Sequence, residues 1–119
     1  MRKLSIQLWT MKELTEKQIE NSILEYLSYL PGTYWKTNNI GVYDVARKVH
    51  RKPGKYFRRG VADILGIDST GKMVAIEVKT KKGRLSPHQK EFLEDINKYG
   101  GIGFVARSVD DVRKELYGQ

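Results

Sequence analysis

Two residues in the middle of the chain have the types and spacing for hydrolytic chemistry. Glu77 and Lys79 end an apolar run that starts at Met73. Side chains alternate along a strand, so both would project from one face, roughly 7 Å apart. The other face would carry Val74, Ile76 and Val78. Isolated charges are costly to bury, so this pair must be hydrated, ion-paired or bound to a metal.

Asp63 is a third candidate, because it lies in a second apolar run from Val61 to Ile67. The turn residues between the two runs predict a hairpin, which would bring Asp63 beside Glu77. Two carboxylates there would repel each other, and a hard cation such as Mg²⁺ or Mn²⁺ removes that penalty through oxygen coordination.

These residues predict a metal held by Asp63, Glu77 and the backbone carbonyl of Val78. Such a metal would activate a water against a phosphodiester bond. Lys79 would orient or deprotonate that water, or neutralise the developing charge. The alternative is purely structural: Glu77 and Lys79 form an ion pair, and Asp63 accepts hydrogen bonds from turn amides. Spacing alone does not decide between the two interpretations, since structural ion pairs are frequent.

The composition favours a polyanionic partner. The chain has 119 residues, a formal charge of +8 and a pI near 9.7. Its length fits one domain, and its basic excess favours nucleic acid. The absence of cysteine excludes disulfides, thiolate zinc sites and a cysteine nucleophile. The first residues lack the apolar run of a signal peptide or membrane span, so we expect a soluble protein of the cytoplasm.

Capping signals and apolar spacing predict three helices. The first begins with a capping box at Thr15–Gln18 and ends at Pro31–Gly32. The second begins after Ser86 and ends at Gly100–Gly101, and the third follows Ser108.

Strands are predicted over Thr33 to Asn38, over both arms of the hairpin and over Ile102 to Arg107. The resulting order of helix, strand, hairpin, helix, strand and helix is typical of the α/β class. We expect one domain over residues 1–119, with a mixed central sheet flanked by helices. Residues 1–14 are expected to include an N-terminal arm.

A longer motif carries a family resemblance. Gly60-Val61-Ala62-Asp63-Ile64-Leu65 is followed by Ala75-Ile76-Glu77-Val78-Lys79-Thr80, by Gly83-Arg84-Leu85-Ser86 and by Gln89. This series resembles the PD-(D/E)XK nuclease superfamily, specifically its virus-type replication-repair nuclease (VRR-NUC) branch. The match runs from about Glu20 to the final strand. Ala62 stands where the superfamily name expects Pro, with no loss of a chemical group.

The resemblance implies a restriction-endonuclease-like fold and a metal-dependent nuclease. It makes Asp63 and Glu77 metal ligands and Lys79 catalytic, and it adds a helical Glu and Gln, which match Glu20 and Gln89 here. On residue evidence alone, Glu20 is an ordinary first-turn residue and Gln89 is the capping-box partner of Ser86. We expect one side-chain geometry of Gln89 not to serve both the cap and the site.

A basic stretch between the first strand and the hairpin is the candidate DNA surface. Seven of the thirteen positions 47–59 are Lys or Arg, interleaved with Tyr56 and Phe57, whose rings could stack on unpaired bases. A solvated loop is the alternative. The residues expected to contact DNA are Arg47, Lys48, Arg51, Lys52, Lys55, Arg58, Arg59, Lys81, Lys82 and Arg84.

The leading hypothesis is an endonuclease acting on branched DNA such as four-way junctions or flaps, a preference implied by resemblance to compact junction resolvases. Such enzymes are typically homodimers, and Leu4, Ile6 and Leu8 could form part of the interface. The resemblance also implies a viral or prophage origin. The alternatives are a non-catalytic nucleic-acid-binding module and a restriction-type nuclease acting on linear duplex.

Overall fold

The computed structural model describes residues 13–37, 43–44, 49–50 and 54–118. Several predictions fall outside these ranges. They concern the arm with Leu4, Ile6 and Leu8, the strand end at Asn38, and the proposed DNA contacts Arg47, Lys48, Arg51 and Lys52.

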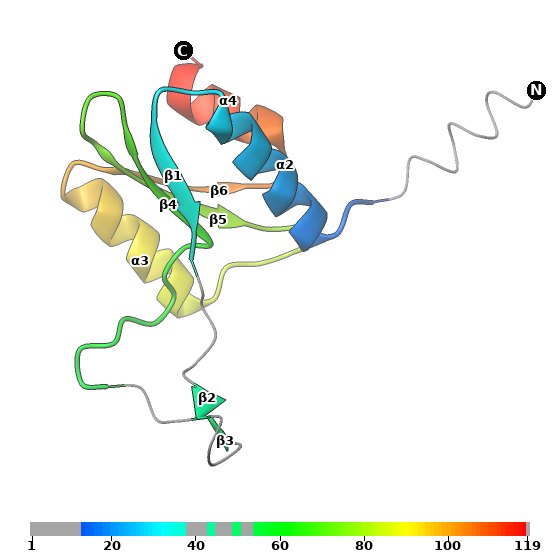
Figure 1. The fold of residues 1–119 in the computed structure, drawn as a ribbon. Helices are drawn as coiled ribbons and strands as arrows, with labels where there is room; N and C mark the ends of the chain where they lie inside the picture. The colour runs from blue at the N-terminus through cyan, green and yellow to red at the C-terminus, as the bar shows by residue number, and fades with distance from the viewer. Residues whose placement is uncertain (1–12, 38–42, 45–48, 51–53, 119) are drawn as a thin grey trace, which may run out of the picture.

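A four-stranded mixed sheet forms the centre of the described fold, with the strand order β1-β4-β5-β6 (Figure 1). The first three strands are antiparallel neighbours, and β6 runs parallel to β5. Three helices cover the sheet, and no described helix is both long and apolar enough to cross a membrane. In chain order the elements are α2 (Glu16–Ser28), β1 (Gly32–Lys36), β2 (Tyr43–Asp44), β3 (Val49–His50), β4 (Ile64–Asp68), β5 (Met73–Val78), α3 (Pro87–Lys98), β6 (Ile102–Ala106) and α4 (Val109–Tyr117).

Each helix begins where a side-chain cap satisfies its first free amides. Thr15 and Gln18 form a reciprocal capping box at α2, and Ser86 and Gln89 form another at α3. The hydroxyl of Ser108 accepts from a backbone amide in the first turn of α4. All three predicted helix starts are therefore confirmed.

The two faces of the sheet are packed by different helices. Helices α2 and α4 cover one face, where they enclose Ile64, Val74, Ile76 and Val78. Helix α3 covers the other, where Phe92 and Leu93 pack with Ala62 and Ala75. The predicted alternation in β5 is confirmed, because Glu77 follows Ala75 on the α3 face.

One element was not predicted. Strands β2 and β3 form a separate antiparallel pair through Tyr43 with His50 and Asp44 with Val49. Two residues per strand are too few to show the alternation that identifies strands in a sequence.

Before it enters the hairpin of β4 and β5, the chain packs against the first turn of α3. At Gly60 φ is +75°, and an added Cβ would lie 2.3 Å from the carbonyl carbon of His88 and 2.6 Å from the amide nitrogen of Gln89. Just before it, the Arg58 guanidinium makes a 2.6 Å ion pair with Asp95 and stacks on the Phe92 ring. These contacts bring the segment that leads to Asp63 against the start of α3.

We expect Gly60→Ala to lower the free energy of unfolding by about 2–6 kcal/mol, the sum of backbone strain and overpacking. Gly71→Ala is the matched control, since φ is +89° there but no atom lies within 4 Å of an added Cβ. The control should lose only the strain, about 1–3 kcal/mol. Urea unfolding measures both variants, and equal losses would contradict a close contact at Gly60.

Candidate active site

The carboxylate of Asp63 is held at the point where the chain enters β4. Its Oδ2 accepts a hydrogen bond of 2.8 Å from the backbone amide of Val78, so the side chain spans from β4 to the end of β5. The backbone is fixed from the other side by Thr37, whose amide donates to the Asp63 carbonyl at 2.8 Å and whose hydroxyl donates to the Ala62 carbonyl at 2.6 Å. Asp63 lies one residue before β4, rather than within the strand as predicted.

Glu77, at the end of β5, is a carboxylate in the interior, with 1% of its surface exposed. Its Oε1 accepts a 2.9 Å hydrogen bond from the side-chain amide of Gln89. Its Oε2 is buried, and no donor among the described residues reaches it. An unsatisfied buried charge is expensive, so this oxygen requires a proton or a cation.

The pKa of Glu77 is accordingly raised from 4.5 to about 9. Burial is the largest cause, followed by a hydrogen bond with Asp63 and the negative charge of Asp63. The positive charge of Lys79 opposes the shift, and Glu16 in the first turn of α2 adds to it. Without a cation, Glu77 is therefore neutral near pH 7, and its carboxyl O–H donates a hydrogen bond to the Asp63 carboxylate.

Gln89 has two roles at once, which corrects the expectation that one side-chain geometry could not serve both. Its Oε1 accepts from the amide of Ser86 at 2.9 Å and completes the capping box of α3. Its Nε2 donates to Glu77 at 2.9 Å. A carboxamide carries an acceptor and a donor on opposite sides, so one rotamer satisfies the cap and the site together.

Glu20 is buried on α2, with 9% of its surface exposed. Its Oε1 lies 3.5 Å from the Nζ of Lys36 at the end of β1. Among the described residues, no group of three or more His, Cys, Asp or Glu could hold a metal ion. The structure therefore does not assemble Glu20, Asp63 and Glu77 into a preformed metal site with three carboxylates.

The pair of Asp63 and Glu77 nevertheless fits a hard divalent cation. The buried Oε2 of Glu77 has no donor in the part of the chain that the structure describes, and the neighbouring carboxylate of Asp63 adds a second negative charge. Mg²⁺ and Mn²⁺ prefer oxygen ligands, and Mg²⁺ usually binds through one or two carboxylates while it keeps several waters.

Lysines surround this end of the sheet. Lys79 directly follows β5 and is half-buried, whereas Lys81 and Lys82 are exposed on the next turn. On the loop before β4, Tyr56 is 90% exposed and Phe57 46% exposed. Arg58 is engaged by Asp95, so part of the predicted basic surface anchors its own loop.

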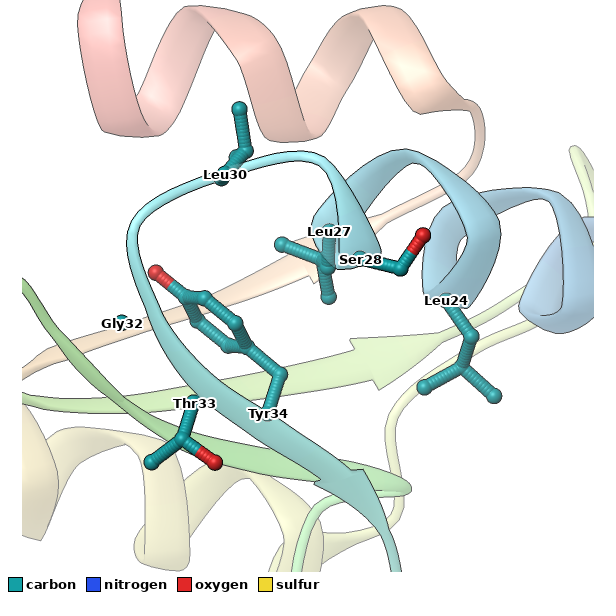
Figure 2. Close-up of a pocket in the computed structure, with 7 residues that line it drawn as sticks. All are labelled: Leu24, Leu27, Ser28, Leu30, Gly32, Thr33 and Tyr34. Atoms are coloured by element: carbon teal, nitrogen blue, oxygen red, sulfur yellow. The ribbon is translucent and has the colours of Figure 1, made fainter.

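Two cavities lie away from the carboxylate pair. One of about 240 Å³ surrounds the turn that joins α2 to β1 and is lined by Leu24, Leu27, Ser28, Leu30, Gly32, Thr33 and Tyr34 (Figure 2). A smaller one, of about 150 Å³, lies between Tyr34, Tyr117 and the turn that begins at Asp68. Neither is lined by Asp63, Glu77 or Lys79.

Three residues at the site were not predicted from the sequence. Lys36 pairs with Glu20, Thr37 fixes the backbone of Asp63, and Arg107 binds carbonyl groups of the turn after Lys79. Each lies far along the chain from its partner. A local sequence pattern therefore gives no signal for them.

The four-stranded mixed sheet with helices on both faces forms an α/β domain with a nuclease-like fold. Residues 11–110 match the model of the VRR-NUC domain. A solved structure described as a VRR_NUC domain protein is similar in fold, with a TM-score of 0.55 and 21% identity over 88% of this chain and 87% of that chain. No curated protein matches the chain. The family match covers most of the sequence, and the chain belongs to the VRR-NUC family of nuclease domains.

The raised pKa of Glu77 makes stability depend on pH when no metal is present. Between pH 4.5 and about pH 9 the folded protein keeps Glu77 protonated, whereas the unfolded chain releases the proton. Ionising the buried carboxyl costs folding free energy. This cost is absent below pH 4.5 and complete above about pH 9, so stability falls as pH rises. In chelator we expect the melting temperature to fall between about pH 6 and pH 8, with a flatter profile for Glu77→Gln. A profile equally steep in the variant would contradict this assignment.

Proposed function

We propose that this chain is a metal-dependent endonuclease that hydrolyses phosphodiester bonds in DNA. The observation that supports this most is the buried Oε2 of Glu77, beside the second carboxylate of Asp63, which no donor among the described residues reaches. Purely structural carboxylates are normally paired or hydrogen-bonded, and perturbed buried groups cluster at functional sites. Membership of the VRR-NUC family supports the same reaction class.

Asp63, Glu77 and the Val78 carbonyl would hold the cation, Mg²⁺ or Mn²⁺, with Glu20 as a further ligand in the assembled complex. The chemistry that a divalent cation supplies here is charge neutralisation on the phosphodiester and activation of a water. Lys36 must move or share Glu20 for this ligand to act, because the two side chains lie 3.5 Å apart.

The protein's own groups would orient the reaction. Gln89 holds Oε1 of Glu77, which leaves Oε2 for the cation, and the Val78 amide holds Asp63 by one oxygen. Lys79 would orient the attacking water, accept its proton when neutral, or offset charge on the phosphate.

The proposed DNA surface surrounds this end of the sheet. Lys55, Arg59, Lys81, Lys82 and Arg84 are exposed and would contact phosphates, and Arg58 keeps 45% of its side chain exposed beside Asp95. The exposed rings of Tyr56 and Phe57 would stack on unpaired bases. That stacking favours substrates with unpaired bases, and we extend the proposal to branched DNA such as four-way junctions and flaps.

A homodimer is part of this proposal, because two copies related by a two-fold axis would present two sites to a pseudo-symmetric junction. The mass in solution tests it, and a strict monomer at micromolar concentration would count against it.

Neutralising the turn after β5 should weaken DNA binding. We expect a Lys81→Ala/Lys82→Ala variant to reduce the slope of log affinity against log salt by up to about 2 for duplex, since each lost phosphate contact removes about 0.9. Lys98→Ala/Lys114→Ala is the matched control. Both pairs lower the formal charge from +8 to +6, but Lys98 and Lys114 lie in the last turns of α3 and α4. Equal slopes for both variants would indicate a general charge effect and contradict a contact by the turn.

The nuclease is tested with end-labelled four-way junction, flap and linear duplex of matched sequence, in Mg²⁺, Mn²⁺ or chelator. We expect metal-dependent cutting, fastest on the branched substrates, and a loss of on the order of 100-fold or more in Glu77→Ala, since metal-based stabilisation of the transition state is worth several kcal/mol. Glu94→Ala, an exposed carboxylate on α3, is the control and should cut normally.

Three results would change the proposal. Salt-sensitive binding without cutting in either metal would favour a non-catalytic binding module on the same fold. Cutting of linear duplex at one defined sequence would favour a restriction-type nuclease. Equal cutting of all three substrates would remove the preference for branched DNA.

A further inference from the structure

Arg107, directly after β6, reaches across to the turn of residues 80–83, which follows β5. Its Nη1 donates to the carbonyl of Thr80, to that of Gly83 at 2.8 Å and, at 3.4 Å, to that of Lys81. The turn is closed on itself by the Gly83 amide, which donates to the Thr80 carbonyl at 3.1 Å. One guanidinium therefore gathers three carbonyls of a single tight turn.

That turn packs on the side chain of Lys79. A Cβ added at Gly83 would lie 3.2 Å from Cδ and 3.3 Å from Cβ of Lys79, so the glycine backbone runs along the aliphatic stem. The main chain of Lys79 is held separately, by a 3.1 Å hydrogen bond from its amide to the Ala106 carbonyl. The main chain of Lys79 is thus fixed by β6, and its stem is bounded by the turn.

The backbone of Arg107 is itself anchored. Its amide donates to Oδ2 of Asp111 at 2.8 Å, and the amide of Asp111 donates to the capping hydroxyl of Ser108 at 3.1 Å. Because neither bond involves the Arg107 side chain, substitution of that side chain leaves the start of α4 intact. The guanidinium therefore extends from a fixed point toward the turn.

We propose that Arg107 is a positioning residue, which holds the turn of residues 80–83 against the stem of Lys79 and so keeps the ammonium group directed at the carboxylate pair. We call the hydrogen bonds from Arg107 to the turn of residues 80–83 the clamp. Its effect on the cleavage rate rests on the proposed function, but the clamp itself does not. All three bonds come from Nη1, so arginine suits the role through the permanent charge and the fixed N–H directions of its planar group, whereas the lysine ammonium rotates freely on its stem.

The test compares Arg107→Ala and Arg107→Lys with Arg113→Ala, an exposed arginine on α4 that pairs with Asp110. Single-turnover cutting is measured with saturating enzyme, at a temperature where every variant is folded by circular dichroism. We expect Arg107→Ala to lose about 10- to 100-fold in rate, since a small misplacement of a catalytic group can cost about 100-fold. The lysine variant should recover part of this rate, and DNA affinity should change by less than about threefold in both variants, as expected for an effect confined to the transition state.

A second pair of variants separates positioning from a general structural effect. If Arg107 acts through Lys79, then Arg107→Ala should cause no further loss in a Lys79→Ala background. Full additivity of the two losses would overturn the proposal. A fall in DNA affinity at an unchanged saturating rate would also overturn it, because it would make Arg107 a DNA contact.

Amide hydrogen exchange tests the clamp without any cleavage. In Arg107→Ala the Gly83 amide should exchange faster, whereas amides within α4 should keep their protection. Unchanged exchange at Gly83 would overturn the proposal. Faster exchange at Gly83 together with no cutting by the unmutated protein would leave the clamp in place and reject the nuclease function.

Discussion

A carboxylate buried beside a second carboxylate sets the central constraint of this domain. Glu77 lies at the end of the central strand, where α3 covers its face of the sheet, and Asp63 is tied to the same strand through the Val78 amide. The charges cannot both persist in a dry environment without compensation. Gln89 supplies one donor to Glu77, which is not enough, and the remaining oxygen requires a proton or a cation.

The rest of the fold keeps this unfavourable arrangement from relaxing. Ile76 and Val78 alternate with Glu77 and are fully buried on the opposite face, so the strand cannot rotate its acidic residue outward without exposing the main core. Asp63 cannot withdraw either, since Thr37 binds its backbone and Gly60 is pressed against the start of α3. The two adjacent carboxylates lower the stability of the folded state, and burial of the apolar core offsets this loss.

The sequence allowed prediction of features that depend on neighbouring residues. Both capping boxes and the hairpin turn follow from side chains within four positions of the groups they satisfy. Lys36 with Glu20 and Arg107 with Gly83 could not be predicted, because only the folded sheet brings these separated residues together. For Gln89 the capping pattern predicted the cap and the family resemblance predicted the site, but neither predicted that one side-chain geometry serves both.

Charge explains why the site and the proposed polyanionic partner are compatible. DNA approaching Asp63 and Glu77 would meet two carboxylates, although the whole chain carries +8. The lysines after β5 bring positive charge to this end of the sheet, and Lys79 already opposes the raised pKa of Glu77. No amine or other donor of the described residues reaches the buried Oε2 of Glu77, so these lysines do not replace a cation between the two carboxylates. A divalent ion would reverse the local charge and make the same site attractive to phosphate, so metal binding and DNA binding should be coupled there.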